Sequence, residues 1–404
     1  MIRAYLIFLL LFYFSFSGTN SYCQWVNQSS NTVYHLQDIH FVDDSIGLVC
    51  GVYGTVLKTI NAGNEWIDVS VGVGAGLFSV FAIDEDTIYA ARSSLYKSVN
   101  GGATWVDVGG LGSNASSIFD LEFLSARTGV LTKSAKVYRS DDYGNSWSEV
   151  YDGSFIRELQ FIDDSLGFAY GGFSLEQINR GRMLKTIDGG ITWDSIYGSE
   201  TLDFTACHFI DRDTGFLFTY PDGIYGTVNG GDEWTEVNSN LPLGQVMDCA
   251  FVTHQIGYAL GYDGNIYKTI DGAINWSLDY GGSGDPLLSL FLTESSAYVT
   301  GRDGKILKND GFITQIKNLE TEEERINIYP NPASGKINIS AEVNKTMNLQ
   351  IHNISGQLLY TEQITGDLHE IDLSQHDNGV YFYTLTDKQS LIKRGKIIIV
   401  KSQE

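Results

Sequence analysis

Hydrophobic and polar residues alternate in short stretches along most of the chain. In the first repeat, Leu36–Val42 alternates as a half-buried strand does, Asp43–Ser45 is typical of a turn, and Gly47–Val52 and Thr55–Ile60 predict two further strands. The same order begins again at Phe78, Phe119, Ile156, Phe204, Met247 and Leu287. A period of about 40–45 residues predicts an all-β fold built from repeated four-stranded units.

Seven tryptophans, 39 to 46 residues apart, mark these repeats. Six of them close the phrase Ser/Thr-x-Asp/Asn-x-Gly/Ala-x-x-Trp, first seen at Thr59–Trp66. The Asp or Asn can bond amides of its own turn, the Gly can adopt positive φ, and the Trp can bury its ring between sheets. We predict structural turns built on Asn61, Gly63, Trp66, Asn100, Gly102, Trp105, Asp142, Gly144, Trp147, Asp188, Gly190, Trp193, Asn229, Gly231, Trp234, Asp271 and Trp276.

This phrase resembles the Asp-box, or BNR repeat. The wider unit Gly257–Gly272 resembles the repeat of photosystem II assembly-factor-like propellers. The resemblance implies a β-propeller. Asp-boxes also occur in sialidases, xyloglucanases and sortilin-type receptors, so the resemblance specifies the fold better than the function.

The two ends of the repeat region look complementary. Gln24–Asn27 has the Trp-bearing pattern of a fourth strand, but no repeat precedes it. The seventh repeat ends in an eroded box, Asn309–Phe312, and no Trp follows. Pairing the two would close the ring and remove its open edges. We therefore predict a seven-bladed β-propeller over residues 24–316.

The first 23 residues predict a secretory signal peptide. Arg3 is their only charged residue, and the apolar stretch Tyr5–Phe14 is too short for a comfortable membrane span. We place cleavage before Gln24 and expect no transmembrane segment after it. A lipidated Cys23 is the alternative, although Asn20 and Tyr22 stand where a lipobox has Leu and a small residue.

Beyond a charged linker, residues 317–325, short alternating strands in residues 326–404 predict a small Ig-like β-sandwich. Its ordered motifs closely resemble the type A C-terminal sorting domain of the type IX secretion system. They contain Tyr329, Pro330, Asn331, Pro332, Gly356, Gly379, Tyr381 and Lys396. The resemblance implies binding to that machinery and export, via the periplasm, to the surface or medium of a Bacteroidetes-like bacterium. An adhesive Ig-like module is the alternative.

Net charge and cysteine content limit the kinds of partner, disulfide and metal site that the chain is expected to have. Residues 24–316 carry a net charge of −21, out of −23 for the chain, which should repel nucleic acid. Cys207 and Cys249 share a core-facing repeat position, which predicts that they are small buried hydrophobic residues. A disulfide between them is the alternative. We predict no cofactor and no metal site, because zinc-ligand spacings are absent.

Motifs of catalysis are scarce. The chain has no nucleophile elbow, zinc-protease motif or P-loop, and it lacks the Arg-Ile-Pro motif of sialidases. A glycosidase with two carboxylates stays open, because acids are abundant. The sequence favours a secreted or cell-surface, non-catalytic scaffold that binds a protein or a glycan. The alternatives are a secreted glycan-active enzyme and an extracytoplasmic assembly factor.

Blade topology predicts where a ligand would bind. The Asp-boxes are third-to-fourth turns and share one face, whereas second-to-third turns and inter-blade links share the other. The longest insertion, Gly171–Arg182, belongs to the latter face. Candidate ligand residues there are Tyr53, Phe173, Glu176, Arg180, Arg182, Tyr220, Tyr262 and Arg302.

Overall fold

The computed structural model describes residues 25–108, 111, 117–153, 155–172, 181–221, 223–242, 245–310, 326–329, 333–341, 346–353, 357–365, 368–387 and 390–401. The predicted signal peptide and charged linker lie outside these residues. Contacts divide the chain into two compact units, Met1–Gly311 and Phe312–Glu404.

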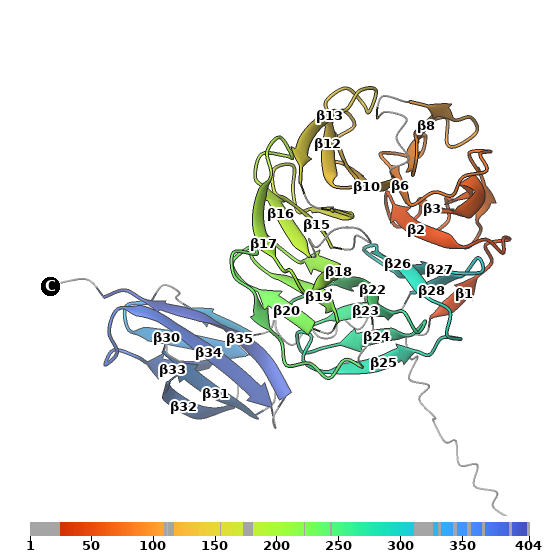
Figure 1. Ribbon diagram of the computed structural model, residues 1–404. Coiled ribbons are helices and arrows are strands. Elements are labelled where there is room, and N and C mark those ends of the chain that lie inside the picture. The colour runs from red at the N-terminus through yellow and green to blue at the C-terminus, as the bar shows by residue number, and fades with distance from the viewer. Residues whose placement is uncertain are drawn as a thin grey trace, which may run out of the picture. The chain divides into compact units, whose positions relative to one another are not determined.

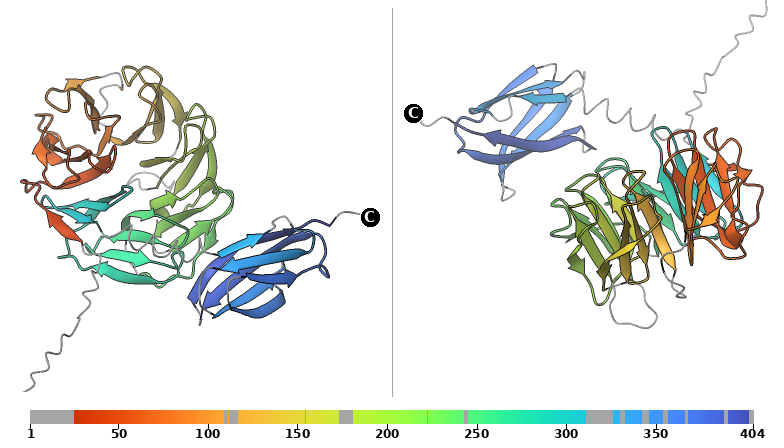
Figure 2. Two further views of the ribbon diagram at one scale, coloured as in Figure 1. Left: turned by 180° about the vertical axis from the view of Figure 1, so that it is seen from behind. Right: turned by 90° about the horizontal axis from the view of Figure 1, so that it is seen from above.

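In its described residues, the first unit contains seven four-stranded antiparallel sheets, here called blades, which surround a central axis (Figure 1; Figure 2). Blade 1 is β2 (Leu36–Phe41), β3 (Gly47–Gly51), β4 (Val56–Thr59) and β5 (Ile67–Asp68). Blade 2 is β6 (Ser79–Ala82), β7 (Thr87–Ala91), β8 (Leu95–Val99) and β9 (Val106–Asp107). Blade 3 is β10 (Ile118–Phe123), β11 (Gly129–Lys133), β12 (Lys136–Ser140) and β13 (Ser148–Asp152).

The remaining blades follow in chain order. Blade 4 is β14 (Glu158–Phe161), β15 (Gly167–Gly171), β16 (Arg182–Thr186) and β17 (Asp194–Gly198). Blade 5 is β18 (Asp203–Phe209), β19 (Gly215–Tyr220), β20 (Gly223–Thr227) and β21 (Thr235–Glu236). Blade 6 is β22 (Val246–Phe251), β23 (Gly257–Gly261), β24 (Ile266–Thr269) and β25 (Trp276–Tyr280). Blade 7 is β26 (Leu287–Leu292), β27 (Ala297–Gly301), β28 (Ile306–Asn309) and β1 (Val26–Gln28).

Blade 7 joins the two ends of the repeat region. Strand β1 pairs antiparallel with β28, with Val26 opposite Lys308 and Gln28 opposite Ile306. The strand expected at Gln24–Asn27 therefore completes the seventh sheet. This pairing also covers the open edge that β28 would otherwise expose.

A packing unit inside the blades explains the spacing of Phe, Gly and Trp. A Cβ atom on Gly47, the first residue of β3, would overlap the ring of Phe41, the last residue of β2. Phe41 in turn meets the Trp66 ring edge-on, with centroids 6.2 Å apart. The same Phe–Trp contact recurs at Phe123–Trp147, Phe161–Trp193, Phe209–Trp234 and Phe251–Trp276. Glycine is required here because the aromatic ring fills the space of a side chain.

The second unit has two sheets. One is β29 (Ile326–Tyr329), β30 (Lys336–Ala341) and β33 (Leu368–Asp372). The other, in spatial order, is β32 (Leu358–Thr365), β31 (Thr346–His352), β34 (Gly379–Asp387) and β35 (Ser390–Ile399). Apolar side chains from both sheets share one core, which includes Ile337, Ile339, Leu349, Ile351 and Ile397.

Candidate ligand-binding face of the propeller

The six Asp-box phrases are self-contained turns. In the first, the Thr59 hydroxyl accepts a bond from the Gly63 amide (2.9 Å) and donates to Asn61 Oδ1 (3.0 Å). Asn61 Oδ1 also accepts from the Glu65 amide (2.9 Å). Equivalent amide-to-hydroxyl bonds join Gly102 to Ser98, Gly144 to Ser140, Gly190 to Thr186, Gly231 to Thr227 and Ala273 to Thr269. The polar groups that recur in all six phrases are thus already hydrogen-bonded within their own turns.

Three carboxylates near the axis join neighbouring blades by hydrogen bonds. Each Asp lies in a first strand and accepts a bond from a backbone amide of the next blade. Asp38 accepts from Val80 (2.9 Å), Asp120 from Leu159 (2.8 Å) and Asp248 from Leu290 (2.7 Å). Serines of the preceding blade, Ser289 and Ser79, donate to Asp38 and Asp120 respectively.

A second set of inter-blade bonds starts from the first strands of blades 3, 4 and 5, two residues beyond the repeat position of these Asp residues. Gln160 exchanges two bonds with the backbone of Phe209 (2.8 and 2.7 Å). Glu122 accepts from the Phe161 amide (3.1 Å), and His208 Nδ1 accepts from the Phe251 amide (3.4 Å). Polar side chains at the axis therefore hold the ring together.

These carboxyl groups titrate far from their usual range. Partial removal from water raises the pKa of Asp38 to about 6, of Asp248 to about 7, and of Glu122 and Glu158 to about 8, although the Glu158 side chain stays 40% exposed. The negative charge of Asp120 adds to this rise at Asp38, Glu122 and Glu158. Burial has the opposite effect on the imidazoles and lowers the pKa of His40 and His208 to about 4.

We expect the thermal midpoint of the protein to fall as the pH rises from about 6 to about 8.5. A carboxyl with a raised folded-state pKa holds its proton in the folded protein after the unfolded chain has lost it, so its stabilising effect is lost as the pH rises through the folded value. Below pH 6.5 the half-buried His40 and His208 oppose this trend, because the folded chain takes up their protons only near pH 4. Scanning calorimetry across this range measures the effect.

Glu158→Gln tests whether these carboxyl groups cause the pH dependence. Among the interactions of the described residues, the Glu158 carboxylate has the Arg157 guanidinium at 4.0 Å and no bond to another blade. The variant should therefore flatten the pH dependence of the thermal midpoint without removing an inter-blade hydrogen bond. An unchanged profile, or a midpoint that rises with pH, would contradict the assignment.

The opposite turns carry the tyrosines that the sequence singled out. Tyr53 lies in the 3-10 turn η1 (Val52–Gly54), Tyr220 ends β19, and Tyr262 follows β23; all three are exposed. Arg302 follows β27 and is also exposed. Arg182 is ion-paired with Glu200 at 3.2 Å, so its charge is partly neutralised. Phe173, Glu176 and Arg180 lie outside the described residues.

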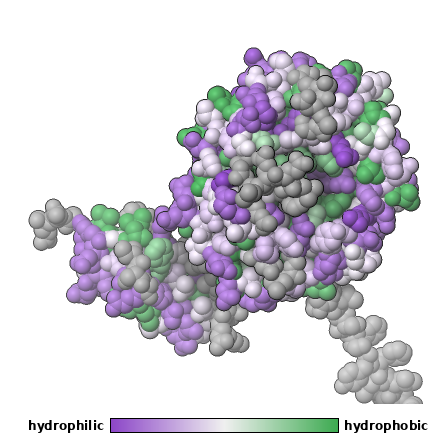
Figure 3. Space-filling model, viewed as in Figure 1, coloured by the Kyte–Doolittle hydropathy of each residue, from purple (hydrophilic) through white to green (hydrophobic). Residues whose placement is uncertain are grey.

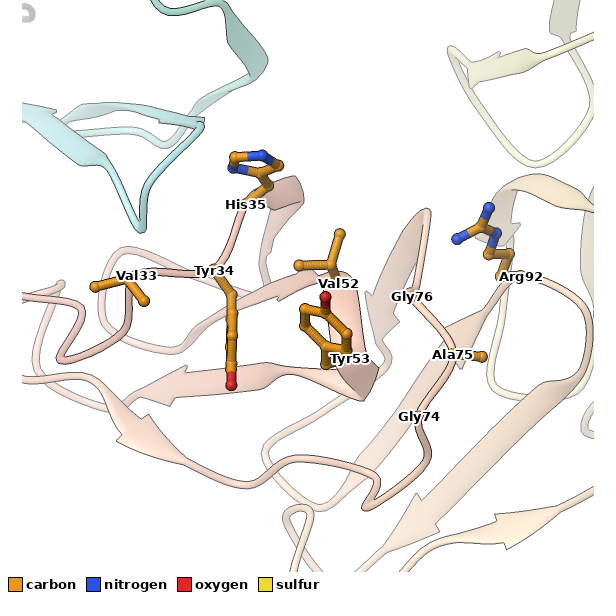
Figure 4. A pocket seen from close by; sticks show the side chains of 9 residues that line it. All are labelled: Val33, Tyr34, His35, Val52, Tyr53, Gly74, Ala75, Gly76 and Arg92. Carbon is orange, nitrogen blue, oxygen red and sulfur yellow. The ribbon is translucent and has the colours of Figure 1, made fainter.

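A pocket of about 460 Å³ opens between blades 1 and 2 at these turns (Figure 4). Tyr34 and Tyr53 form one side, with ring centroids 4.9 Å apart. The inter-blade link Gly74–Gly76 and Arg92 form the other side, and His35 and Val52 lie between (Figure 4). The side chains lining this pocket include no carboxylate.

A second pocket, of about 370 Å³, opens between blades 5 and 6. It brings together Tyr220 and Tyr262 with Pro242 and Tyr267. Its one carboxylate, Asp263, already accepts bonds from the Tyr267 hydroxyl (2.8 Å) and Asn265. Both pockets thus occur where a second-to-third turn meets an inter-blade link.

Sequence reasoning did not assign a role to Arg92, Tyr34 or His35. Arg92 follows β7 as Tyr53 follows β3, so the repeat register could have placed it on this face. Tyr34 and His35 precede the first strand of blade 1, and no repeat motif marks them. On the face seen in Figure 3, hydrophobic residues lie in small groups among hydrophilic ones.

The described sorting-motif residues lie in the second unit. Tyr329 ends β29 and is exposed, Gly379 begins β34, and Lys396 lies in β35. Tyr381 is buried, and its hydroxyl donates to the Asp377 carbonyl (2.7 Å). Pro330, Asn331, Pro332 and Gly356 lie outside the described residues.

Cys50, Cys207 and Cys249 are buried and carry free thiols. In the described part of the chain, no three His, Cys, Asp or Glu side chains are grouped so that they could hold a metal ion. A helix long and apolar enough to cross a membrane is likewise absent from the described residues.

Comparison with known proteins identifies the C-terminal domain. Residues 327–401 match the family model described as the secretion system C-terminal sorting domain. The chain therefore carries a type IX sorting domain, and it is a secreted or cell-surface protein of a Bacteroidetes-type bacterium. No curated protein sequence matches it.

Solved structures similar to this chain are β-propellers. YCF48 from Cyanidioschyzon merolae is 18% identical, with a TM-score of 0.61, over 72% of this chain and 99% of that one. YCF48 bound to D1 peptide is 16% identical, with a TM-score of 0.59, over 72% and 97%. The GH74 xyloglucanase from Xanthomonas campestris is 12% identical, with a TM-score of 0.50, over 69% and 60%. At these identities the likeness establishes the propeller fold alone.

Proposed function

We propose that this exported propeller is a non-catalytic binding module that holds a protein or glycan ligand on the face of its second-to-third turns. The observation that carries the proposal is the recurrence of a tyrosine-lined pocket at two blade junctions. Tyrosine offers a large rigid contact area with a polar tip, which suits recognition surfaces. A peptide-bound propeller of similar fold, YCF48 with D1 peptide, is consistent with this use of the scaffold.

The lining of these pockets supports binding rather than hydrolysis. A glycosidase needs two carboxyl groups about 5–10 Å apart across the scissile bond. The pocket between blades 1 and 2 has no carboxylate, and Asp263 in the other is engaged by Tyr267 and Asn265. Among the described residues that line the two pockets, no two carboxyl groups form such a pair.

To test the proposal, the full secreted chain is used to probe arrays of glycans and of peptides. For ligands found, Tyr53→Asn or Tyr262→Ala should weaken binding by about tenfold or more, as loss of an aromatic anchor does, with an unchanged thermal midpoint. The substitution Tyr53→Asn is chosen because Asn tolerates the left-handed backbone (φ 60°) at that position.

Tyr143→Asn is the matched control. Tyr143 is similarly exposed and also has positive φ, but it lies in an Asp-box turn on the opposite face. Binding that is lost equally in the control, or retained in both test variants, would move the ligand site away from the second-to-third turns.

A further inference from the structure

In the pocket between blades 1 and 2, the guanidinium of Arg92 has no anionic partner among the described residues. It lies over the ring of Phe78, 4.2 Å from the ring centroid, and no ion pair of the described chain includes it. Gly76 makes room for it, since a Cβ atom there would lie 2.8 Å from Arg92 Nη1. An unpaired guanidinium in so acidic a propeller is a strong site for a carboxylate, because it can donate several N–H bonds.

The tyrosine side of the pocket is already in place before any ligand binds. Tyr53 has φ 60° and ψ 28°, a left-handed conformation that a tyrosine adopts only when its surroundings impose it. The turn is fixed by bonds from Thr55 Oγ1 to the Val52 carbonyl (2.7 Å) and from the Val52 amide to His35 (3.0 Å). Little ordering of the turn backbone is then required on binding, which favours affinity.

His35 adds a second donor. Its Nδ1 accepts a bond from the Asp303 amide of blade 7 (3.2 Å), which leaves Nε2 as the N–H donor of the ring, and the Asp303 carboxylate lies 3.6 Å from the same Nδ1. The described residues that line the pocket therefore combine an aromatic pair, a cation and an imidazole donor, and the one carboxylate in contact with them is that of Asp303, outside the lining. This set suits an aromatic group next to a single carboxylate.

The charge of the propeller outside the pocket favours a peptide over an acidic glycan as the ligand. The negative charges of Asp120, Asp248 and Asp38 are near enough to raise the pKa of Glu158, so acids gather in the first strands of the blades. The propeller as a whole carries −21, which repels a polyanionic chain. A peptide can place one carboxylate at Arg92 and carry basic residues elsewhere, and so fits both features.

We propose that this pocket binds a peptide segment in which a carboxylate lies next to an aromatic side chain. The carboxylate accepts N–H bonds from Arg92, and the aromatic ring packs against Tyr34 and Tyr53. The carboxylate comes either from a peptide C-terminus or from an Asp or Glu side chain. This inference rests on the proposed function, of which it specifies one subsite.

The test uses the full secreted chain and two minimal probes, N-acetyl-phenylalanine and its neutral amide. NMR titration should show the acid binding about tenfold more tightly than the amide, the low end of the range for a charge-assisted hydrogen bond. Arg92→Gln should abolish that preference. Arg157→Gln, which removes an arginine that lies over Phe119 (5.8 Å to the ring centroid) outside the pocket and is paired with Glu158, should leave it intact.

Equal binding of acid and amide, a preference that survives in Arg92→Gln, or no binding at about 10 mM would each overturn the inference. N-acetyl-aspartyl-phenylalaninamide distinguishes the two peptide sources, since it offers only a side-chain carboxylate. A preference for methyl glucuronide over methyl glucoside, with none between the phenylalanine probes, would assign the pocket to an acidic sugar instead. In each of these cases, the proposed function would still hold if binding of a ligand from the arrays is weakened by Tyr262→Ala.

Discussion

Deleting residues 326–404 is expected to leave a folded propeller that stays in the periplasm of its native host. The first unit has its own buried cores and is completed within itself by the pairing of β1 with β28. The deleted part contains the matched sorting domain, residues 327–401. Fractionation and immunodetection of the truncated chain measure where it accumulates, and circular dichroism of the purified chain reports whether it is folded.

The converse fusion is the control for this experiment. Residues 312–404, the whole second unit, joined to a periplasmic reporter should carry it to the cell surface or medium. Arrival of the truncated propeller at the surface, with the reporter fusion retained inside, would contradict the role of this domain.

The fold was predictable because its signals are local. One Trp-bearing turn per repeat defines a blade, and Trp25 without a preceding repeat indicates a strand that belongs to the last sheet. The hydroxyl and the Asn or Asp side chain of each Asp-box lie within a few residues of the amides that they bind, so sequence spacing alone specifies these bonds.

The axial carboxylates were not predictable from alternation. A β-bulge between Leu36 and Asp38 shifts the register of β2 against β3, and the same irregularity recurs in blades 3, 5, 6 and 7. Strict alternation would place Leu36 and Asp38 on one face. The bulge instead leaves Leu36 buried in the core while Asp38 bonds the next blade.

The pocket of Tyr34, Tyr53 and Arg92 was only half predictable. The repeat register places Tyr53 and Arg92 on one face, but their meeting depends on how blade 1 packs against blade 2. Tyr34 and His35 come from the segment before β2, which has no counterpart with these side chains in the other repeats. A site made at a junction of repeats is therefore read from the packed structure rather than from one repeat.

Trp25→Ala is expected to destabilise the propeller by about 3–5 kcal/mol, as truncations of large core residues do. Trp25 is only 4% exposed. It meets the Tyr258 ring of blade 6 edge-on, with centroids 6.1 Å apart, and its indole donates to Asp279 (2.8 Å). The side chain thus fixes β1 to blade 6 while β1 pairs with β28, so its loss weakens the hold of the fourth strand of blade 7.

Urea unfolding followed by circular dichroism measures this change without relying on tryptophan fluorescence. Val26→Ala is the matched control, because Val26 lies on the same strand but is 55% exposed, and its truncation should cost less than about 1 kcal/mol. The variant without Trp25 should also self-associate more readily, since a loosened β1 uncovers the edge of β28. Equal stability of the two variants would show that the ring does not depend on this strand for closure.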